Sequence, residues 1–292
     1  MKGANKMDIL SDILGEWEKN AAVTSDDYTG EDGLIYCAKC HTPKQQVLEE
    51  KVWKSFTKIT PDFPRITYRA CDCIAEEERR QDEAKHIAKI EQAREACFPG
   101  EEELRTYRFS NDRGIGDREA MQKARTYADG FSYALENNIG LLIWGDVGRG
   151  KSHLAACIAN SVIEQGYSCL MTNFMNISDG AFDADKHKTE YFDSFSWYDL
   201  LIIDDFGAER QSGYVDEIII KVIERRCNSG KPIIVTTNLE PKKMLNPKNR
   251  IEDKRIFSRI FKMTRQIPVK GEDLRTVLNA EIAEKSMKFF GF

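Results

Sequence analysis

The sequence predicts an α/β fold, with a parallel sheet flanked by helices, preceded by a small zinc-binding N-terminal domain. From about residue 103 onward, short apolar strands alternate with helical stretches, which is typical of a parallel sheet covered on both faces. Four cysteines gather near the N-terminus in two short-spaced pairs, a pattern typical of a structural metal site. "FPG" at 98–100 interrupts the chain between these regions. We expect one domain over 1–98 and a second over 103–292.

Composition and charge exclude several classes of protein. The net charge of -5 gives no global reason to bind nucleic acid, so any basic surface must be local. No apolar run approaches the roughly 20 residues that span a bilayer, and the N-terminal region does not resemble a secretory leader. Eight cysteines in 292 residues are too few for a disulfide scaffold. We expect a cytoplasmic protein without a membrane partner.

The N-terminal domain begins with a polar stretch that contains one apolar stripe at helical spacing. This short helix either packs on its own domain or docks on a partner. Between about Ile74 and Cys97 the sequence is dense in charge and in good helix formers, which indicates a solvated connecting helix. The stripe consists of Ile9, Leu10, Ile13, Leu14 and Trp17.

The cysteine pairs are Cys37 with Cys40, as CxxC, and Cys71 with Cys73, as CxC. Four thiolates suffice as ligands for tetrahedral Zn²⁺. A region with so few apolar residues needs a metal cross-link of this kind to fold. His41 is an alternative ligand; four free thiols, a redox pair and an iron–sulfur cluster are alternative interpretations. The other cysteines are expected to be small buried side chains in the second domain: Cys97, Cys157, Cys169 and Cys227.

A phosphate-binding loop follows the first strand of the second domain. Gly145, Gly150, Lys151 and Ser152 fit G-x-x-x-x-G-K-[ST], between the strand "GLLIW" and an amphipathic helix. Backbone N–H groups of such a loop wrap around phosphates, Lys151 reaches the β- and γ-phosphates, and Ser152 ligates Mg²⁺. We expect nucleotide contacts from the whole loop, namely Gly145, Asp146, Val147, Gly148, Arg149, Gly150, Lys151, Ser152 and His153.

Two later strands end in polar residues that suit the same site. "DLLIID" at 199–204 leads into Asp204 and Asp205, and "PIIVTTN" at 232–238 ends in Asn238. Asp204 suits the Mg²⁺ shell, Asp205 is a candidate general base or a support for the metal, and Asn238 is a candidate for orienting water. The remaining expected strands are 140–144, 168–173 and a weaker one at 265–269.

The phosphate loop, "DLLIIDDFGAE", "KPIIVTTNL", "RIFSRIFK" and "GEDLR" together resemble the AAA+ ATPases of the DnaC/DnaI helicase-loader family, which includes IstB-type transposition ATPases. The resemblance covers about residues 103–280 and implies an AAA+ P-loop NTPase domain that hydrolyses ATP with Mg²⁺. It implies that Asn238 is sensor 1 and Arg275 is sensor 2. Arg259, one helical turn after Arg255, then matches the arginine finger of a self-associating ATPase; a surface salt-bridge face is the alternative.

The resemblance also implies a function, which is to hold a hexameric replicative DNA helicase and release it on single-stranded DNA. A zinc-bearing domain ahead of the ATPase resembles the DnaI-like branch by arrangement, and there this domain contacts the helicase. The stretch Lys242–Arg275 has an excess of basic residues that favours phosphate contacts, and Phe174 either stacks on bases or lies in the core. Alternatives are a transposition accessory ATPase, a non-hydrolysing ATP-switch adaptor and, remotely, a small-molecule kinase.

Overall fold

The structure is a computed structural model that describes residues 23–58, 60–184, 187–207, 213–246 and 248–291. The chain forms two compact units, Met1–Ala88 and Lys89–Phe292. The expected apolar stripe between Ile9 and Trp17 lies outside the described residues. Among the described residues, no helix is long and apolar enough to cross a membrane.

The first unit is built from two short antiparallel hairpins and a helix. β1 (Tyr28–Thr29) pairs with β2 (Ile35–Tyr36), and β3 (Gln45–Val47) pairs with β4 (Ile66–Tyr68). In its described part, the buried apolar side chains are those of Cys37, Phe63 and Cys71. This unit therefore has almost no apolar core of its own. Its helices are α2 (Glu50–Thr57) and the first part of α3 (Asp72–Cys97), which continues into the second unit.

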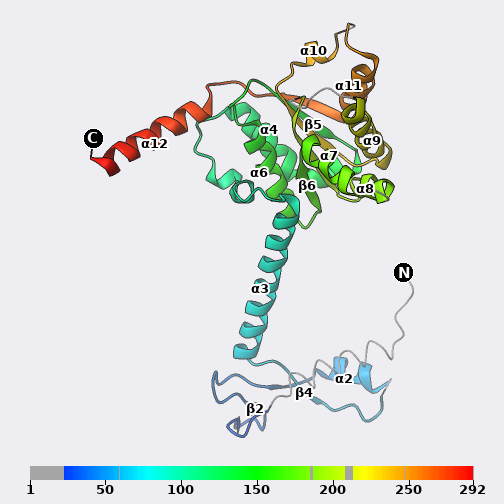
Figure 1. The fold of residues 1–292 in the computed structure, drawn as a ribbon. Helices are drawn as coiled ribbons and strands as arrows, with labels where there is room; N and C mark the ends of the chain where they lie inside the picture. The colour runs from blue at the N-terminus through cyan, green and yellow to red at the C-terminus, as the bar shows by residue number, and fades with distance from the viewer. Residues whose placement is uncertain (1–22, 59, 185–186, 208–212, 247, 292) are drawn as a thin grey trace. The chain divides into compact units, whose positions relative to one another are not determined.

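The second unit contains a five-stranded parallel sheet in the order β6-β7-β8-β5-β9. Its strands β5 and β6 are labelled in Figure 1. All five strands expected from the sequence are present. They are β5 (Gly140–Trp144), β6 (Cys169–Thr172), β7 (Leu200–Phe206), β8 (Ile233–Thr237) and β9 (Thr264–Pro268).

Helices cover both faces of this sheet, because alternate strand residues point to opposite sides. Leu141 and Ile143 pack in the cluster that includes α4 and α6, whereas Leu142 packs in the cluster that includes α7, α9 and α11. The helices are α4 (Arg118–Asp129), α5 (Phe131–Glu136), α6 (Lys151–Glu164), α7 (Phe174–Asp183), α8 (Lys188–Ser194), α9 (Gly213–Ser229), α10 (Pro241–Met244), α11 (Ile251–Met263) and α12 (Leu274–Phe290), with 3-10 turns at Leu104–Thr106 and Phe109–Asn111.

Burial tests the core positions expected for Phe174 and for the four cysteines outside the pairs. Phe174 is 1% exposed and its ring meets that of Phe206 edge-on, so the core alternative is correct for this residue. Of the four cysteines outside the pairs, Cys97, Cys157 and Cys169 are buried, and Cys227 is half-buried against the α9 side of the core.

Arg226 of α9 is fully buried and joins three segments of the second unit. Its guanidinium donates hydrogen bonds to the carbonyl oxygens of Tyr198 and Asp199, just before β7, and of Pro232, just before β8. A further bond goes to the carbonyl oxygen of Phe195, and Nε donates a second bond to Pro232, which makes five bonds to four carbonyl oxygens. Burial lowers the pKa of Arg226 to about 10, and the four carbonyl groups satisfy the planar fork of donors.

Candidate nucleotide and metal sites

The glycine-rich loop connects the end of β5 at Trp144 to the start of α6 at Lys151. Gly148 and Gly150 have φ of +78° and +86°, in the left-handed region that favours glycine. At Gly145, a Cβ atom would lie 2.3 Å from the carbonyl oxygen of Val269, so only glycine fits there. Arg149 forms an ion pair with Asp146, and the Val147 side chain is exposed. The sequence thus folds into a tight loop directly before a helix N-terminus, which is a geometry that binds anions.

Lys151 lies in the first turn of α6 and is 7% exposed. Its Nζ donates hydrogen bonds to the carbonyl oxygen of Asp146 at 2.8 Å and to Oδ1 of Asn238 at 2.6 Å. Burial lowers the pKa of Lys151, and the nearby carboxylates of Asp205 and Asp204 oppose this effect. The structure therefore places a buried ammonium group between the loop and the end of β8.

The acidic end of β7 and the polar end of β8 are joined by hydrogen bonds. The Thr236 hydroxyl donates to Oδ1 of Asp204 at 2.5 Å and accepts from the backbone N–H of Asp205 at 2.9 Å. Asn238 Nδ2 donates to Oδ1 of Asp205 at 3.2 Å. Asp205 has φ of +52°, which is uncommon for a residue other than glycine. Lys151, Asn238 and Asp205 thus form one connected chain of hydrogen bonds.

Thr236 was not found by sequence reasoning. The sequence feature that could have revealed it is a polar residue within the apolar run of β8, two positions before Asn238. The side chain is fully buried, and β8 lies next to β7, so its hydroxyl serves the neighbouring strand. It orients both aspartates at once.

The glycine-rich loop, Asp204 and Asp205 of β7, and Asn238 after β8 line a cavity of about 740 Å³. Ser152, Asp204, Asp205, Asn238 and Arg275 all line it. A serine hydroxyl and a carboxylate are hard oxygen donors, so Ser152 and Asp204 fit the chemistry of Mg²⁺.

The cavity extends beyond the loop to a segment that sequence reasoning did not assign. Tyr107 and Met121 line this end together with His153. The His153 ring meets the Tyr107 ring edge-on with centroids 4.7 Å apart, and burial lowers the pKa of His153, which favours the neutral imidazole at pH 7. Asn160 of α6 holds this segment by donating to the carbonyl oxygens of Leu104 and Tyr107. An end lined by aromatic and apolar side chains of this kind suits a nucleobase.

Arg259 does not line the cavity. Its Nη2 pairs with Oε1 of Glu224 on α9 at 2.6 Å, and Arg255 lies 3.8 Å from the same carboxylate. The two arginines share one face of α11, as expected from their spacing. Arg250 is paired with Asp216 and Asp253. Acidic residues from α9 and α11 therefore offset part of the basic excess in Lys242–Arg275.

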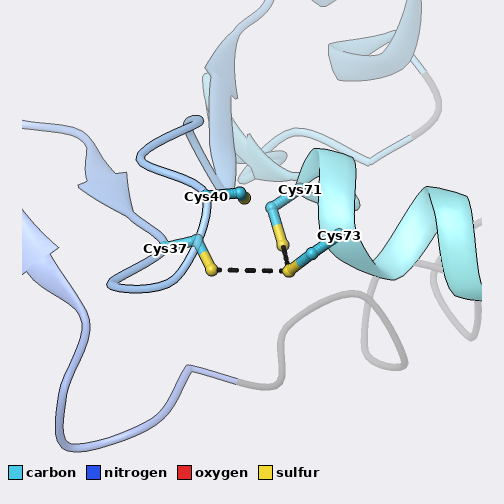
Figure 2. A group of neighbouring side chains, drawn as sticks. All are labelled: Cys37, Cys40, Cys71 and Cys73. Atoms are coloured by element: carbon cyan, nitrogen blue, oxygen red, sulfur yellow. Dashed lines mark hydrogen bonds between the residues drawn. The ribbon is translucent and has the colours of Figure 1, made fainter.

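The four N-terminal cysteines converge in the first unit (Figure 2). Their sulfur atoms all lie within 4.8 Å of one another, with Cys37 and Cys73 at 3.7 Å and Cys71 and Cys73 at 3.3 Å. A metal with bonds of about 2.3 Å to four sulfurs would separate them by roughly 3.8 Å. The donor set and its spacing fit tetrahedral Zn²⁺.

Thr42 holds the two cysteine pairs in place. Its carbonyl oxygen accepts from the Cys37 N–H at 3.0 Å, and its hydroxyl oxygen accepts from the Asp72 N–H at 3.0 Å. The same hydroxyl lies 3.1 Å from the Cys40 sulfur and, with the backbone N–H of Thr42, lowers the pKa of that thiol to about 5. Of Cys73 and the alternative ligand His41, it is the sulfur of Cys73 that lies within the group of four sulfur atoms. His41 Nδ1 lies instead 3.2 Å from the Tyr28 hydroxyl oxygen.

A buried ion pair supports the CxxC loop. Asp27 accepts a hydrogen bond from the Ala38 N–H, between Cys37 and Cys40, and pairs with Lys44 at 2.7 Å. The hydrogen bond from Lys44 holds the pKa of Asp27 well below its usual range. These contacts support the loop in addition to the sulfur atoms.

Comparison with known proteins supports the likeness expected from the sequence. Residues 54–281 match the family model described as IstB-like ATP binding protein. The chain is 32% identical over 134 residues to the replicative helicase loader DnaC of Escherichia coli K12, covering 44% of this chain and 53% of that protein. It is 32% identical over 145 residues to DnaC of Buchnera aphidicola subsp. Schizaphis graminum, covering 48% and 56%.

The chain spans about half the length of the curated relatives that it matches. Among solved structures, a crystal structure of DnaI superimposes with a TM-score of 0.50 at 22% identity, covering 57% of this chain and 93% of that one. This likeness concerns the fold. The predicted fold class, an AAA+ P-loop domain with a parallel sheet flanked by helices, is confirmed.

Proposed function

Since the chain belongs to the family of IstB-like ATP binding proteins, we propose that it is an ATP-dependent loader of the replicative DNA helicase onto single-stranded DNA. The reaction is hydrolysis of ATP to ADP and phosphate. The similarity to DnaC loaders supports the helicase and DNA partners. In this proposal, the ATPase is the domain over 103–292 and the helicase contact belongs to the cysteine-bearing domain over 1–98.

One observation carries the ATPase part of the proposal, namely the hydrogen-bonded chain Lys151–Asn238–Asp205 beside the glycine-rich loop. It joins a phosphate-binding lysine to a candidate base and a candidate water-orienting amide. These side chains come from α6, from β7 and from the residue that follows β8. Their convergence in one cavity matches what in-line attack of water on a γ-phosphate requires.

The residues divide the work as follows in the proposed reaction. Loop N–H groups hold the phosphates, and Lys151 exchanges its bonds to Asp146 and Asn238 for phosphate oxygens. Asp205 accepts a proton from the attacking water, which Asn238 orients. Ser152 and Asp204 would hold Mg²⁺, which would neutralise charge on the phosphates.

The two arginines complete the proposed site. Arg275 lines the cavity and reaches the γ-phosphate in the same chain, whereas Arg259 serves a neighbouring chain. The Glu224 carboxylate holds the Arg259 side chain until the neighbour's nucleotide replaces it as partner. Turnover would then depend on self-association.

Arg259→Ala should leave nucleotide affinity within twofold, because this side chain does not line its own chain's cavity. Turnover by the assembled protein should fall at least tenfold, since a finger arginine stabilises transition-state charge. Affinity is measured with a fluorescent ATP analogue and turnover by phosphate release at increasing protein concentration. Arg225→Ala, which also removes an ion pair between an arginine and an acidic residue, is the matched control and should change neither value.

An equal loss of ATP binding in Arg259→Ala would assign the arginine to its own chain's site. Unchanged turnover at every protein concentration would contradict the finger assignment.

The loader role is tested by mixing the chain with the hexameric replicative helicase of its native cell, with and without ATP. The helicase should be retained in one nucleotide state and transferred to circular single-stranded DNA as ATP is hydrolysed. Retention of a transposase instead would favour the transposition accessory ATPase. Single-turnover assays without phosphate release, with or without single-stranded DNA, would favour the non-hydrolysing adaptor.

A further inference from the structure

The segment that follows β9 runs beside the glycine-rich loop and is tied to it by backbone hydrogen bonds. The N–H of Val269 donates to the carbonyl oxygen of Trp144 at 2.8 Å, and the N–H of Leu274 donates to that of Gly148 at 2.9 Å. Between them, the N–H of Lys270 donates to Oδ2 of Asp117, at the start of α4, at 2.8 Å. The first turn of α12 is therefore fixed against the phosphate-binding loop.

Asp273 lies at the start of α12, beside the glycine-rich loop. It is the N-cap of α12, and its Oδ1 accepts from the Arg275 N–H at 2.9 Å. The same oxygen lies only 1.9 Å from where a Cβ atom on residue 148 would be, so the carboxylate fills the space left by Gly148. Leu274 packs in the same way on Gly150, with Cδ1 3.0 Å from a Cβ placed there.

This contact places a carboxylate beside a loop that is to bind phosphates, which is electrostatically unfavourable. The contribution of the Asp273 carboxylate to the site must therefore be geometric and not electrostatic. Capping fixes the direction in which α12 starts, and the packing on Gly148 fixes the distance of α12 from the loop. Arg275, two residues later, lines the cavity from this first turn.

We propose that Asp273 is the positioning residue for Arg275: by capping α12 and filling the space at Gly148, it holds the arginine at the γ-phosphate end of the cavity. The inference rests on the proposed function, in which Arg275 contacts the γ-phosphate. Asp273 acts through Arg275 and does not itself contact nucleotide. Two effects of opposite sign follow, because losing the cap misplaces Arg275 and losing the charge alone removes a repulsion.

The experiment separates the cap from the charge by comparing Asp273→Ala with Asp273→Asn, since asparagine caps helices as well as aspartate does. The readout is the ratio of ATP to ADP affinity, together with kcat and KM. Asp273→Ala should lower the preference for ATP over ADP about fivefold, which is the factor that corresponds to the free energy of one lost helix N-cap. The affinity for ADP should stay within twofold. Asp273→Asn should retain the preference for ATP or increase it.

A double mutant tests whether Asp273 works through the arginine. Arg275→Ala should lower the preference for ATP, and adding Asp273→Ala should cause no further loss. Asn173→Ala is the matched control, because Asn173 caps α7 by accepting from the Asn176 N–H and lies outside the cavity lining. It should lower the melting temperature without changing the ATP-to-ADP ratio.

An unchanged ratio in Asp273→Ala, with a lowered one in Arg275→Ala, would overturn the inference. Losses that add in the double mutant would overturn it as well. If Asp273→Asn behaved like Asp273→Ala, the charge and not the cap would matter, which also contradicts the proposal. Failure of the proposed function has a different signature, namely that the unmodified chain binds neither ATP nor ADP.

Discussion

Lys151→Ala is expected to lower the affinity for ATP at least 100-fold and to reduce ATP turnover below detection. Charge-assisted hydrogen bonds from a buried ammonium group to phosphate oxygens contribute several kcal/mol, and about 2.7 kcal/mol corresponds to a factor of 100. No other lysine lines the described cavity, so the loss is not made up by a neighbour.

The fold should survive this substitution. The hydrogen bonds from Lys151 to Asp146 and Asn238 offset the free-energy cost of burying its charge, so removing the side chain removes both terms. Alanine also has the highest helix propensity for the first turn of α6. Isothermal titration with ATP and a phosphate-release assay measure the effect, and the melting temperature reports the fold. Lys221→Ala, which removes an exposed lysine paired with Glu217, serves as the control and should bind ATP normally. Unchanged affinity and turnover in Lys151→Ala would falsify the site.

Cys37→Ser is expected to release the metal and to unfold the first unit while leaving ATP binding by the second unit intact. The described part of the first unit buries few apolar side chains, so metal binding must supply much of its folding free energy. Structural Zn²⁺ sites contribute roughly 10–16 kcal/mol of apparent binding free energy. Losing one of four thiolates removes most of that contribution.

Metal content by mass spectrometry and limited proteolysis measure the two effects separately. The unmodified chain should carry one Zn²⁺ per molecule, and a fragment containing the second unit should resist protease in Cys37→Ser. Cys227→Ser, on α9 of the second unit, is the matched thiol control and should keep its metal. A purified chain without zinc or iron would rule out the metal site, whereas iron with sulfide would replace zinc by a cluster.

The local features of the nucleotide site could be predicted from sequence because each lies in one short motif. Lys151 and Ser152 follow a glycine pattern with one geometric solution, and Asp204 and Asn238 follow apolar strands. Parallel strands present their carboxyl ends at the same edge of a sheet, so the expected meeting of these residues follows from strand type alone.

Features that depend on packing between distant segments could not be predicted. Thr236 matters because β8 lies beside β7, and nothing in its own strand shows that order. Glu224 pairs with Arg259 because α9 and α11 pack together, although 35 residues separate them. Asp273 could be recognised as a helix N-cap from its sequence, but its contact with Gly148 depends on the path of the chain after β9.

The buried guanidinium of Arg226 has a consequence at the opposite edge of the sheet. It anchors the entry of β7 through Asp199 and the entry of β8 through Pro232, and thereby sets the stagger of these adjacent strands. The register set there holds from Leu201 to Ile203, and the pairing shifts between Ile203 and Phe206, where the Thr236 hydroxyl contacts Asp204 and the Asp205 N–H. A buried arginine thus fixes the beginnings of the two strands whose far ends carry Asp205 and Asn238.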